Sequence, residues 1–221
     1  MSDPIQTPST TPRDTAVQCR RATTPIDIDG TGGWEHADVV YDFASHWLPD
    51  VRGASGRTRA RLLWDDDHLY FLAELIDEEL ISSSSEDGAR LWLGDVFELF
   101  FKPAADAPGY YEFQVNPAGA RLNMYIPERS RDAYDRWRSS RPFAWRTAVR
   151  RTDDGWAVAG AIPWSDFTPT GGAPRRGDVW RFALCRYDYS TGQPPVLTSS
   201  APLQRADFHR YEDWGDLRFV D

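Results

Sequence analysis

The chain has 221 residues, of which 41% are hydrophobic and 14% are aromatic, enough to bury the core of one large domain. Its 25 basic and 34 acidic side chains give a net charge of −9, which argues against binding to nucleic acid or to an anionic membrane. Ten tryptophans exceed what such a core usually needs, and tryptophan is favoured where an apolar surface meets a polar partner, although any one of them can equally be core filler.

Residues 1–16 are polar and rich in Thr and Pro, so we expect a disordered tail followed by one domain over residues 17–221. The tail lacks the apolar stretch of a secretion signal, which as written favours a cytoplasmic chain, and no segment is apolar enough to span a membrane. Cys19 and Cys185 are the only cysteines. Two cysteines are too few for a cysteine-rich metal site. They form either one long-range disulfide or two free thiols.

The first clear strand lies at residues 57–64, where polar and apolar side chains alternate. Arg59 and Arg61 point one way, while Ala60 and Leu62 point the other, which is the period of a half-buried strand. The following Asp-Asp-Asp, residues 65–67, predicts a tight turn, because short acidic side chains accept hydrogen bonds from turn amides. We therefore expect a hairpin with the next strand, residues 68–75.

Short strands then continue to the end of the chain. We expect them at residues 96–101, 110–116, 121–126, 145–151, 156–162, 179–187 and 217–220, with a helical turn at 163–167. Residues 127–144 are an irregular insertion, either a helix or a long loop that carries ligand contacts, or else a solvated charged excursion. This pattern predicts an all-β fold, a single antiparallel β-sandwich of jelly-roll type.

Polar residues share one face of two of these strands. Strand parity places Glu98 opposite the core residues of its own strand, and Gln114 and Asn116 opposite those of the next one. If the two strands pair, a carboxylate and amides lie side by side, and such a mixture of acceptors and donors suits sugar hydroxyls. An ordinary solvated outer face is the alternative.

Aromatic residues occur at both ends of this region. Trp92 precedes the strand of Glu98, and Phe208 and His209 lie in a loop near the C-terminus. A flat ring can stack on the apolar face of a pyranose while polar groups bind its rim. Core packing for the rings, and a structural hydrogen bond for His209, are the alternatives.

At these residues the sequence resembles the family 9 carbohydrate-binding modules. The resemblance covers nearly the whole chain from Pro25, and its order and spacing are more specific than any single motif. The matching segments are Ile26-Asp27-Ile28-Asp29-Gly30 with Trp34, residues 63–70 (LWDDDHLY), residues 92–100 (WLGDVFELF), residues 161–164 (AIPW), and Phe208-His209 with residues 214–219 (WGDLRF).

This resemblance implies non-catalytic binding of a carbohydrate, a terminal sugar of a β-linked plant-type polysaccharide or oligosaccharide held between two aromatic rings. It assigns stacking to Trp92 and Phe208, and hydrogen bonding to Glu98, Gln114 and Asn116, to which His209 is added as a neighbour. Phe208 stands where the family often has Trp, and Gln114 where it has Arg, which suits a divergent branch with another glycan or with none.

The resemblance bears on cofactors and compartment as well. No cofactor is required, although structural calcium occurs in the family and aspartates in turns could bind it; no loop here has ligands at calcium spacing. The family also points to exported proteins, and the oligomeric state stays open.

Three other functions compete with sugar binding. A glycosidase would need paired carboxylates, and Asp95 and Glu98, three apart on one strand, point to opposite faces. A haem-binding electron carrier would use Met124 with His68 or His209. A structural or accessory module without sugar affinity would bury Trp92.

Overall fold

The computed structural model describes residues 16–29, 32–41, 43–49, 57–138 and 141–221. The expected N-terminal tail, residues 1–16, lies outside these ranges except for its last residue. None of the helices in the described ranges has both the length and the apolar character needed to cross a bilayer.

Twelve strands in the described ranges join by hydrogen bonds into one curled sheet. They are β1 (Val17–Arg21), β2 (Val39–Val40), β3 (Thr58–Trp64), β4 (His68–Ile76), β5 (Val96–Lys102), β6 (Tyr110–Val115), β7 (Arg121–Ile126), β8 (Arg146–Thr152), β9 (Gly155–Pro163), β10 (Val179–Asp188), β11 (Val196–Ser199) and β12 (Gly215–Val220). The helical elements are η1 (Leu91–Leu93), α1 (Ala133–Trp137) and η2 (Trp164–Thr170).

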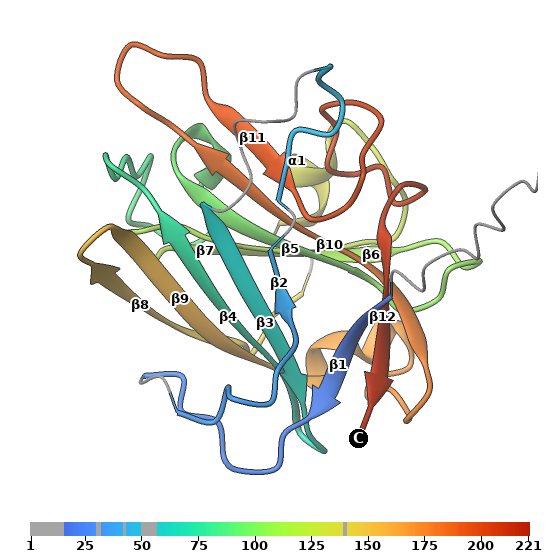
Figure 1. Cartoon of the computed structure of the whole chain (residues 1–221). Coiled ribbons are helices and arrows are strands. Elements are labelled where there is room, and N and C mark those ends of the chain that lie inside the picture. The colour runs from blue at the N-terminus through green and yellow to red at the C-terminus, as the bar shows by residue number, and fades with distance from the viewer. Residues whose placement is uncertain (1–15, 30–31, 42, 50–56, 139–140) are drawn as a thin grey trace, which may run out of the picture.

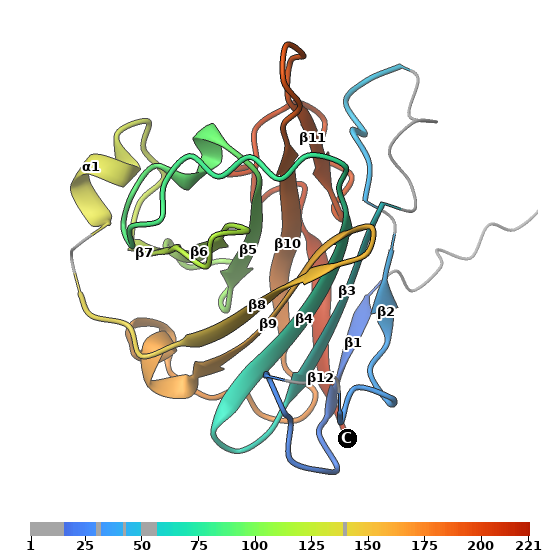
Figure 2. The same ribbon diagram turned by 90° about the vertical axis from the view of Figure 1, so that its left-hand side faces the viewer.

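The sheet folds over into two layers. Its strand order is β7-β6-β5-β10-β12-β1-β3-β4-β9-β8, with β11 beside β10 and β2 beside β3. The first four strands form one layer and the last four form the other, while β12 and β1 connect them (Figures 1 and 2). The predicted β-sandwich is confirmed. Its antiparallel pattern is broken by β1, which was not predicted and runs parallel to both β12 and β3.

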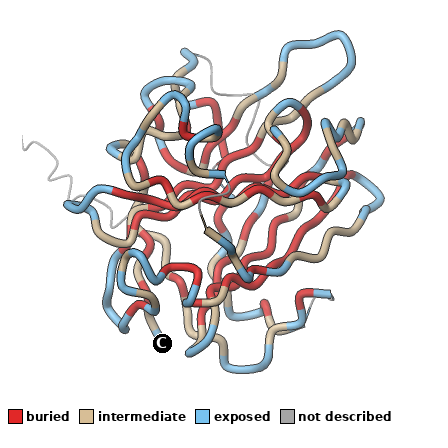
Figure 3. The backbone as a smooth tube through the Cα atoms, turned by 180° about the vertical axis from the view of Figure 1, so that it is seen from behind, coloured by how far each residue is buried: buried red, intermediate tan, exposed pale blue. Residues whose placement is uncertain are grey.

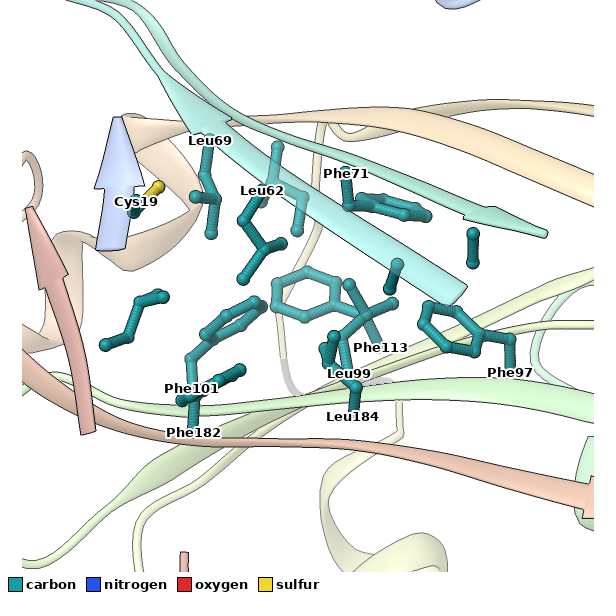
Figure 4. Packing of buried hydrophobic residues seen from close by; sticks show 14 of the residues in the cluster. Cys19, Leu62, Leu69, Phe71, Phe97, Leu99, Phe101, Phe113, Phe182 and Leu184 are labelled. Carbon is teal, nitrogen blue, oxygen red and sulfur yellow. The ribbon is translucent and has the colours of Figure 1, made fainter. Parts of the chain in front are cut away.

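The main core fills the space between the layers. Phe97, Leu99 and Phe101 of β5 point toward Leu62 of β3 and Phe71 of β4 (Figure 4). Burial follows the strands, whereas many of the loops that connect them are exposed (Figure 3). The alternation predicted for the strand at residues 57–64 is confirmed, since Ala60 and Leu62 are buried and Arg59 is exposed.

The outer face of the β7-β6-β5-β10 layer is also covered. A second apolar cluster there includes Phe100, Tyr110, Met124 and Trp214, and α1 lies against β7 (Figure 2). The insertion at residues 127–144 therefore contains a short helix that helps to cover the sheet. As a result every residue of β5 and β6 is buried, and the polar face expected on these strands lies beneath a cover.

The two cysteines lie on opposite faces of the sheet. Cys19 belongs to the core between the layers, and Cys185 to the outer cluster. Both thiols are free, so the disulfide left open by the sequence is not formed. Burial raises the pKa of both thiols well above the ordinary value.

A buried guanidinium ties the layers together at one end of the sandwich. Arg186 of β10 is 2% exposed, and its Nη2 lies 3.0 Å from Oδ2 of Asp77, just after β4, and 3.0 Å from Oδ2 of Asp188. Its Nη1 donates to the Arg57 carbonyl and to the Thr58 hydroxyl, each at 3.3 Å. Removing one partner of such a pair leaves the other charge buried without compensation.

We therefore expect Arg186→Met to lower the free energy of unfolding by about 3 to 5 kcal/mol in urea denaturation. The matched control is Arg181→Met on the same strand. Its ion pair with Asp216 (2.8 Å) joins side chains that are 31% and 45% exposed, so the loss should stay below about 1 kcal/mol. Equal small losses in both variants would contradict this role of Arg186.

Candidate functional site

A cavity of about 610 Å³ opens on the outer face of the β7-β6-β5-β10 layer. Its floor comes from β5, β6 and β7, and residues 129–134 and 205–209 form walls around it, with Trp92, Tyr187 and Leu197 completing the lining. This volume lies within the range of roughly 300 to 1,000 Å³ typical of small-ligand sites. The cavity contains polar and apolar groups in close proximity.

Three polar side chains form the floor. Glu98 and Gln114 are directly paired in the register of β5 and β6, which confirms that they share a face, and Glu112 is two residues earlier on that face. All three are at most 3% exposed. Gln114 Nε2 donates to Glu112 Oε1 at 2.5 Å. Glu112 Oε2 and Gln114 Oε1 are buried and receive no hydrogen bond.

Glu112 could be placed from the sequence as well. Strand parity puts it on the face of Gln114, but it was not named as a site residue. Because Tyr111, Phe113 and Val115 point into the main core, residues 112 and 114 must face the cavity side. The two-residue spacing of Glu112 and Gln114 thus places a second carboxylate on the floor.

Burial dominates the electrostatics of the floor. It raises the pKa of Glu98 well above the usual range, and the nearby charge of Glu112 raises it further. Burial also raises the pKa of Glu112, while nearby His209 and the hydrogen bond from Gln114 partly lower it. At the cavity wall the pKa of Tyr187 is raised by burial and, in addition, by Glu98. The floor is therefore a costly place for negative charge unless a positive group or protons balance it.

Trp92 stands at the edge of the floor, as the sequence predicted. It lies in η1 and is partly buried, and its ring meets Tyr134 of α1 edge-on, with centroids 5.0 Å apart and planes at 81°. The Tyr189 hydroxyl donates to the Trp92 carbonyl at 2.9 Å, which fixes the turn. Tyr134 lines the cavity too and was missed, because nothing in its charged segment marked it.

Phe208 lines the cavity as predicted but is only 5% exposed. Its ring packs against Trp47 and Tyr187, with centroids 6.3 and 5.2 Å away. Its carbonyl accepts a hydrogen bond from Trp214 Nε1 at 2.9 Å. Little of this ring is open to a ligand, so Trp92 and Tyr134 are the more accessible aromatic groups.

His209 also lines the cavity, and it belongs to a wall held in place by polar contacts. Its Nδ1 lies 2.9 Å from the Tyr110 hydroxyl. Arg129, in the opposite wall, donates to the His209 carbonyl at 3.1 Å and binds both carboxylate oxygens of Glu212 at 2.7 and 2.8 Å. These bonds to Arg129 lower the pKa of Glu212 to about 2. The two walls are thus joined at one side of the cavity.

Asn116 does not belong to this site. It is fully buried and is not among the residues that line the cavity. Its Nδ2 donates to the Ser84 carbonyl at 2.7 Å, and its Oδ1 accepts from the Ala120 amide at 3.0 Å. The side chain stabilises the turn after β6, and this accounts for both of its polar groups.

Two acidic groups in the described ranges have the spacing of metal ligands: Asp65, Asp67 and His68, and Asp77, Asp95 and Asp188. In the first, the Asp65 carboxylate accepts from the amides of Asp67 and His68 and from the Tyr70 hydroxyl, each at 2.8 Å. In the second, Arg186 is the cation. The Asp65 oxygens and most oxygens of the second group already serve polar contacts, so a calcium ion would have to share or displace them.

The geometry also bears on the rival functions. Asp95 is fully buried, accepts from the amides of Ile81 (2.5 Å) and Tyr189 (2.7 Å), and is not part of the cavity lining. It therefore does not pair with Glu98. Met124 and His209 both line the cavity, whereas His68 is the first residue of β4 and is not part of the lining.

A family model described as carbohydrate family 9 binding domain-like matches residues 26–221. Endo-1,4-beta-xylanase A of Thermoanaerobacterium saccharolyticum is 31% identical over 151 residues, which are 67% of this chain and 12% of the relative. The chain thus spans about an eighth of the length of this relative.

Solved structures share the fold. A family 9 module from Caldicellulosiruptor kristjanssonii in complex with cellotriose has a TM-score of 0.62 at 16% identity, covering 93% of each chain. A putative carbohydrate-binding protein from Bacteroides uniformis has a TM-score of 0.70 at 16% identity, covering 92% of this chain and 98% of the other.

The raised pKa of Glu98 predicts a stability that depends on pH. The folded protein holds this proton above the ordinary pKa of 4.5, so stability should be highest below that value and fall as pH rises. We expect Glu98→Gln to gain stability over the native chain as the pH rises above 4.5, by about 1.4 kcal/mol for each unit by which burial raises the pKa of Glu98. Urea denaturation across this range measures it.

Glu128→Gln is the control for this measurement. Glu128 is exposed and lies outside the cavity lining, so the same loss of charge should give no trend with pH. A Glu98→Gln variant that is less stable than the native chain at neutral pH would mean that the carboxylate has a stabilising partner.

Proposed function

Because this chain belongs to the carbohydrate family 9 binding domain-like family, we propose that it binds a terminal sugar of a β-linked plant-type polysaccharide or oligosaccharide without catalysing a reaction. The observation that carries this proposal is the cavity in which a partly exposed Trp92 stands beside the polar floor of Glu98, Glu112 and Gln114. An aromatic face for the C–H groups and polar groups for the rim are what a pyranose requires.

The proposed contacts differ in part from those expected from the sequence. Trp92 stacks on the sugar, and Tyr134 forms the side of this aromatic corner. Glu98, Gln114 and His209 bind hydroxyl groups, with Glu112 as a further acceptor. Phe208 contributes only the small part of its ring that reaches the cavity.

The shape of the cavity supports a chain end as the ligand. Arg129 joins the two walls through His209 and Glu212, so a polymer cannot pass through the cavity on that side. The neighbouring structure with cellotriose and the xylanase relative support β-linked sugars as the class. Polysaccharides of this kind occur outside the cell, so this ligand fits a protein that is exported.

Catalysis is not part of the proposal. Two of the carboxylates that line the cavity, Glu98 and Glu112, lie close together on the same floor, and a third, Asp207, lies in a wall. A glycosidase instead needs two carboxylates on opposite sides of the scissile bond. The carboxylates of this floor could bind a sugar from below, and the Asp207 carboxylate accepts a hydrogen bond from the His209 amide at 3.1 Å, which ties it to its own loop.

Haem binding is the second candidate, because Met124 and His209 line the same cavity. The floor argues against it. Two buried carboxylates and an amide would lie against the apolar face of a macrocycle and leave their oxygens without donors. A visible absorption band of the purified, haem-supplemented protein would favour haem over sugar.

We expect Trp92→Ala to weaken binding of cellobiose or xylobiose by about 2 kcal/mol or more, since a central aromatic contact often contributes that much. Isothermal titration calorimetry gives the affinity, and tryptophan fluorescence of the native chain should shift on binding. The thermal midpoint should change little, because Trp92 is only partly buried.

Leu93→Ala is the matched control. Leu93 belongs to the same turn, is 59% exposed and does not line the cavity, so its loss should leave affinity unchanged. If Trp92→Ala binds both disaccharides as the native chain does, or if it fails to fold, Trp92 is not the stacking residue.

A further inference from the structure

The cavity floor holds two buried carboxyl groups that no arginine or lysine of the described residues balances. Glu98 and Glu112 are 2% and 3% exposed, and in the described parts of the chain neither has an ion pair with arginine or lysine. His209 is the one basic side chain whose charge acts on Glu112. The other groups that face the floor, Tyr187 and Cys185, are neutral when protonated.

The arginines that line the cavity do not reach this floor. Arg129 is bound to Glu212 and lies over the Tyr211 ring at 4.6 Å. Arg131 and Arg205 line the cavity but are exposed. The arginines of the cavity therefore lie at its walls and mouth, as does the Asp207 carboxylate, while Glu98 and Glu112 lie at its base.

The floor also offers acceptors in excess of donors. Gln114 uses its amide nitrogen on Glu112, which leaves Gln114 Oε1 and Glu112 Oε2 buried without a donor. No donor among the described residues bonds to the Glu98 carboxylate. Three acceptor groups thus face the cavity, and an ammonium group has three donors and no acceptor. A hydroxyl group has only one donor and no charge. With a hydroxyl group bound, the carboxylates could be neutralised only by taking up protons.

From this match we propose that the preferred ligand is a β-linked amino sugar, whose free ammonium group is bound by Glu98, Glu112 and Gln114 at the base of the cavity. This inference rests on the proposed function, and narrows its ligand to sugars with a cationic substituent. Trp92 stacks on the same sugar, and the single positive charge of the ammonium group offsets one of the two carboxylates, while the other carboxyl group keeps its proton. Charge-assisted hydrogen bonds there are stronger than those of a neutral hydroxyl.

Three β-1,4-linked disaccharides that differ only at C2 test the proposal at neutral pH. They are cellobiose with a hydroxyl group, the glucosamine disaccharide with an ammonium group, and its di-N-acetyl form with a neutral amide. We expect the glucosamine disaccharide to bind the native chain about tenfold more tightly than either neutral sugar, the difference between a charged and a neutral hydrogen bond. Isothermal titration calorimetry measures all three.

Glu98→Gln and Glu112→Gln keep the shape of the floor and remove one charge each. Each should reduce the preference for the glucosamine disaccharide over cellobiose to about threefold or less. Glu128→Gln, outside the cavity lining and exposed, removes the same charge and should keep the full preference. This control separates the floor from general attraction of a cation to an acidic protein.

The outcomes distinguish the two proposals. If cellobiose binds and the glucosamine disaccharide binds equally or more weakly, the amino-sugar inference is overturned while carbohydrate binding stands. A preference that survives both floor substitutions also overturns it, because the ammonium group then lies elsewhere. If none of the three sugars binds, the proposed function itself fails.

Discussion

The covering of β5 and β6 on both faces is the constraint on which the site depends. Their inner side chains fill the core between the layers, and α1 with the loops around it covers their outer face. Polar residues on that outer face would be solvated in an open sandwich. Here they are buried, and burial is what raises the pKa of Glu98 and Glu112 and leaves oxygens without donors.

Two clusters of buried acidic side chains in the described ranges have different surroundings, which indicate different roles. Around Asp77, Arg186 supplies a positive charge and several donors, so the group is balanced within the fold and holds the layers together. Around Glu98 and Glu112 no such cation is present among the described residues. Burying acceptors without donors beside a cavity lowers the stability of the fold. This loss brings a benefit only when a ligand supplies the missing donors, and such an exchange of stability for binding is common at functional sites.

Much of the fold could be predicted from the sequence, because alternation and turn residues are local signals. The hairpin at Asp65 and the pairing of Glu98 with Gln114 are confirmed. β1 was missed because it has only five residues and its parallel partners, β12 and β3, are distant in the sequence. Strand parity also predicted which face of these strands carries polar groups. It could not predict that α1 and the loops around it cover this face, because their packing on the sheet depends on contacts that no local sequence pattern indicates.

The same limit explains which site residues were found. Motif order correctly indicated five of the residues that line the cavity, namely Trp92, Glu98, Gln114, Phe208 and His209. Strand parity could not separate Gln114 from Asn116, since both have the same parity. Only the turn contacts to Ser84 and Ala120 show that Asn116 is structural.

The walls of the cavity are held before any ligand arrives. Arg129 connects the wall at residues 129–134 to that at residues 205–209. The Tyr189 hydroxyl holds η1 at the Trp92 carbonyl, and the Asp95 carboxylate in turn holds the amides of Ile81 and Tyr189. Ordering these segments on binding would cost affinity, and their fixed position avoids that cost. The unpaired acceptors at the base of this preformed cavity then determine which ligand is preferred. A ligand that fits the walls but has no donors for these acceptors would bind only weakly.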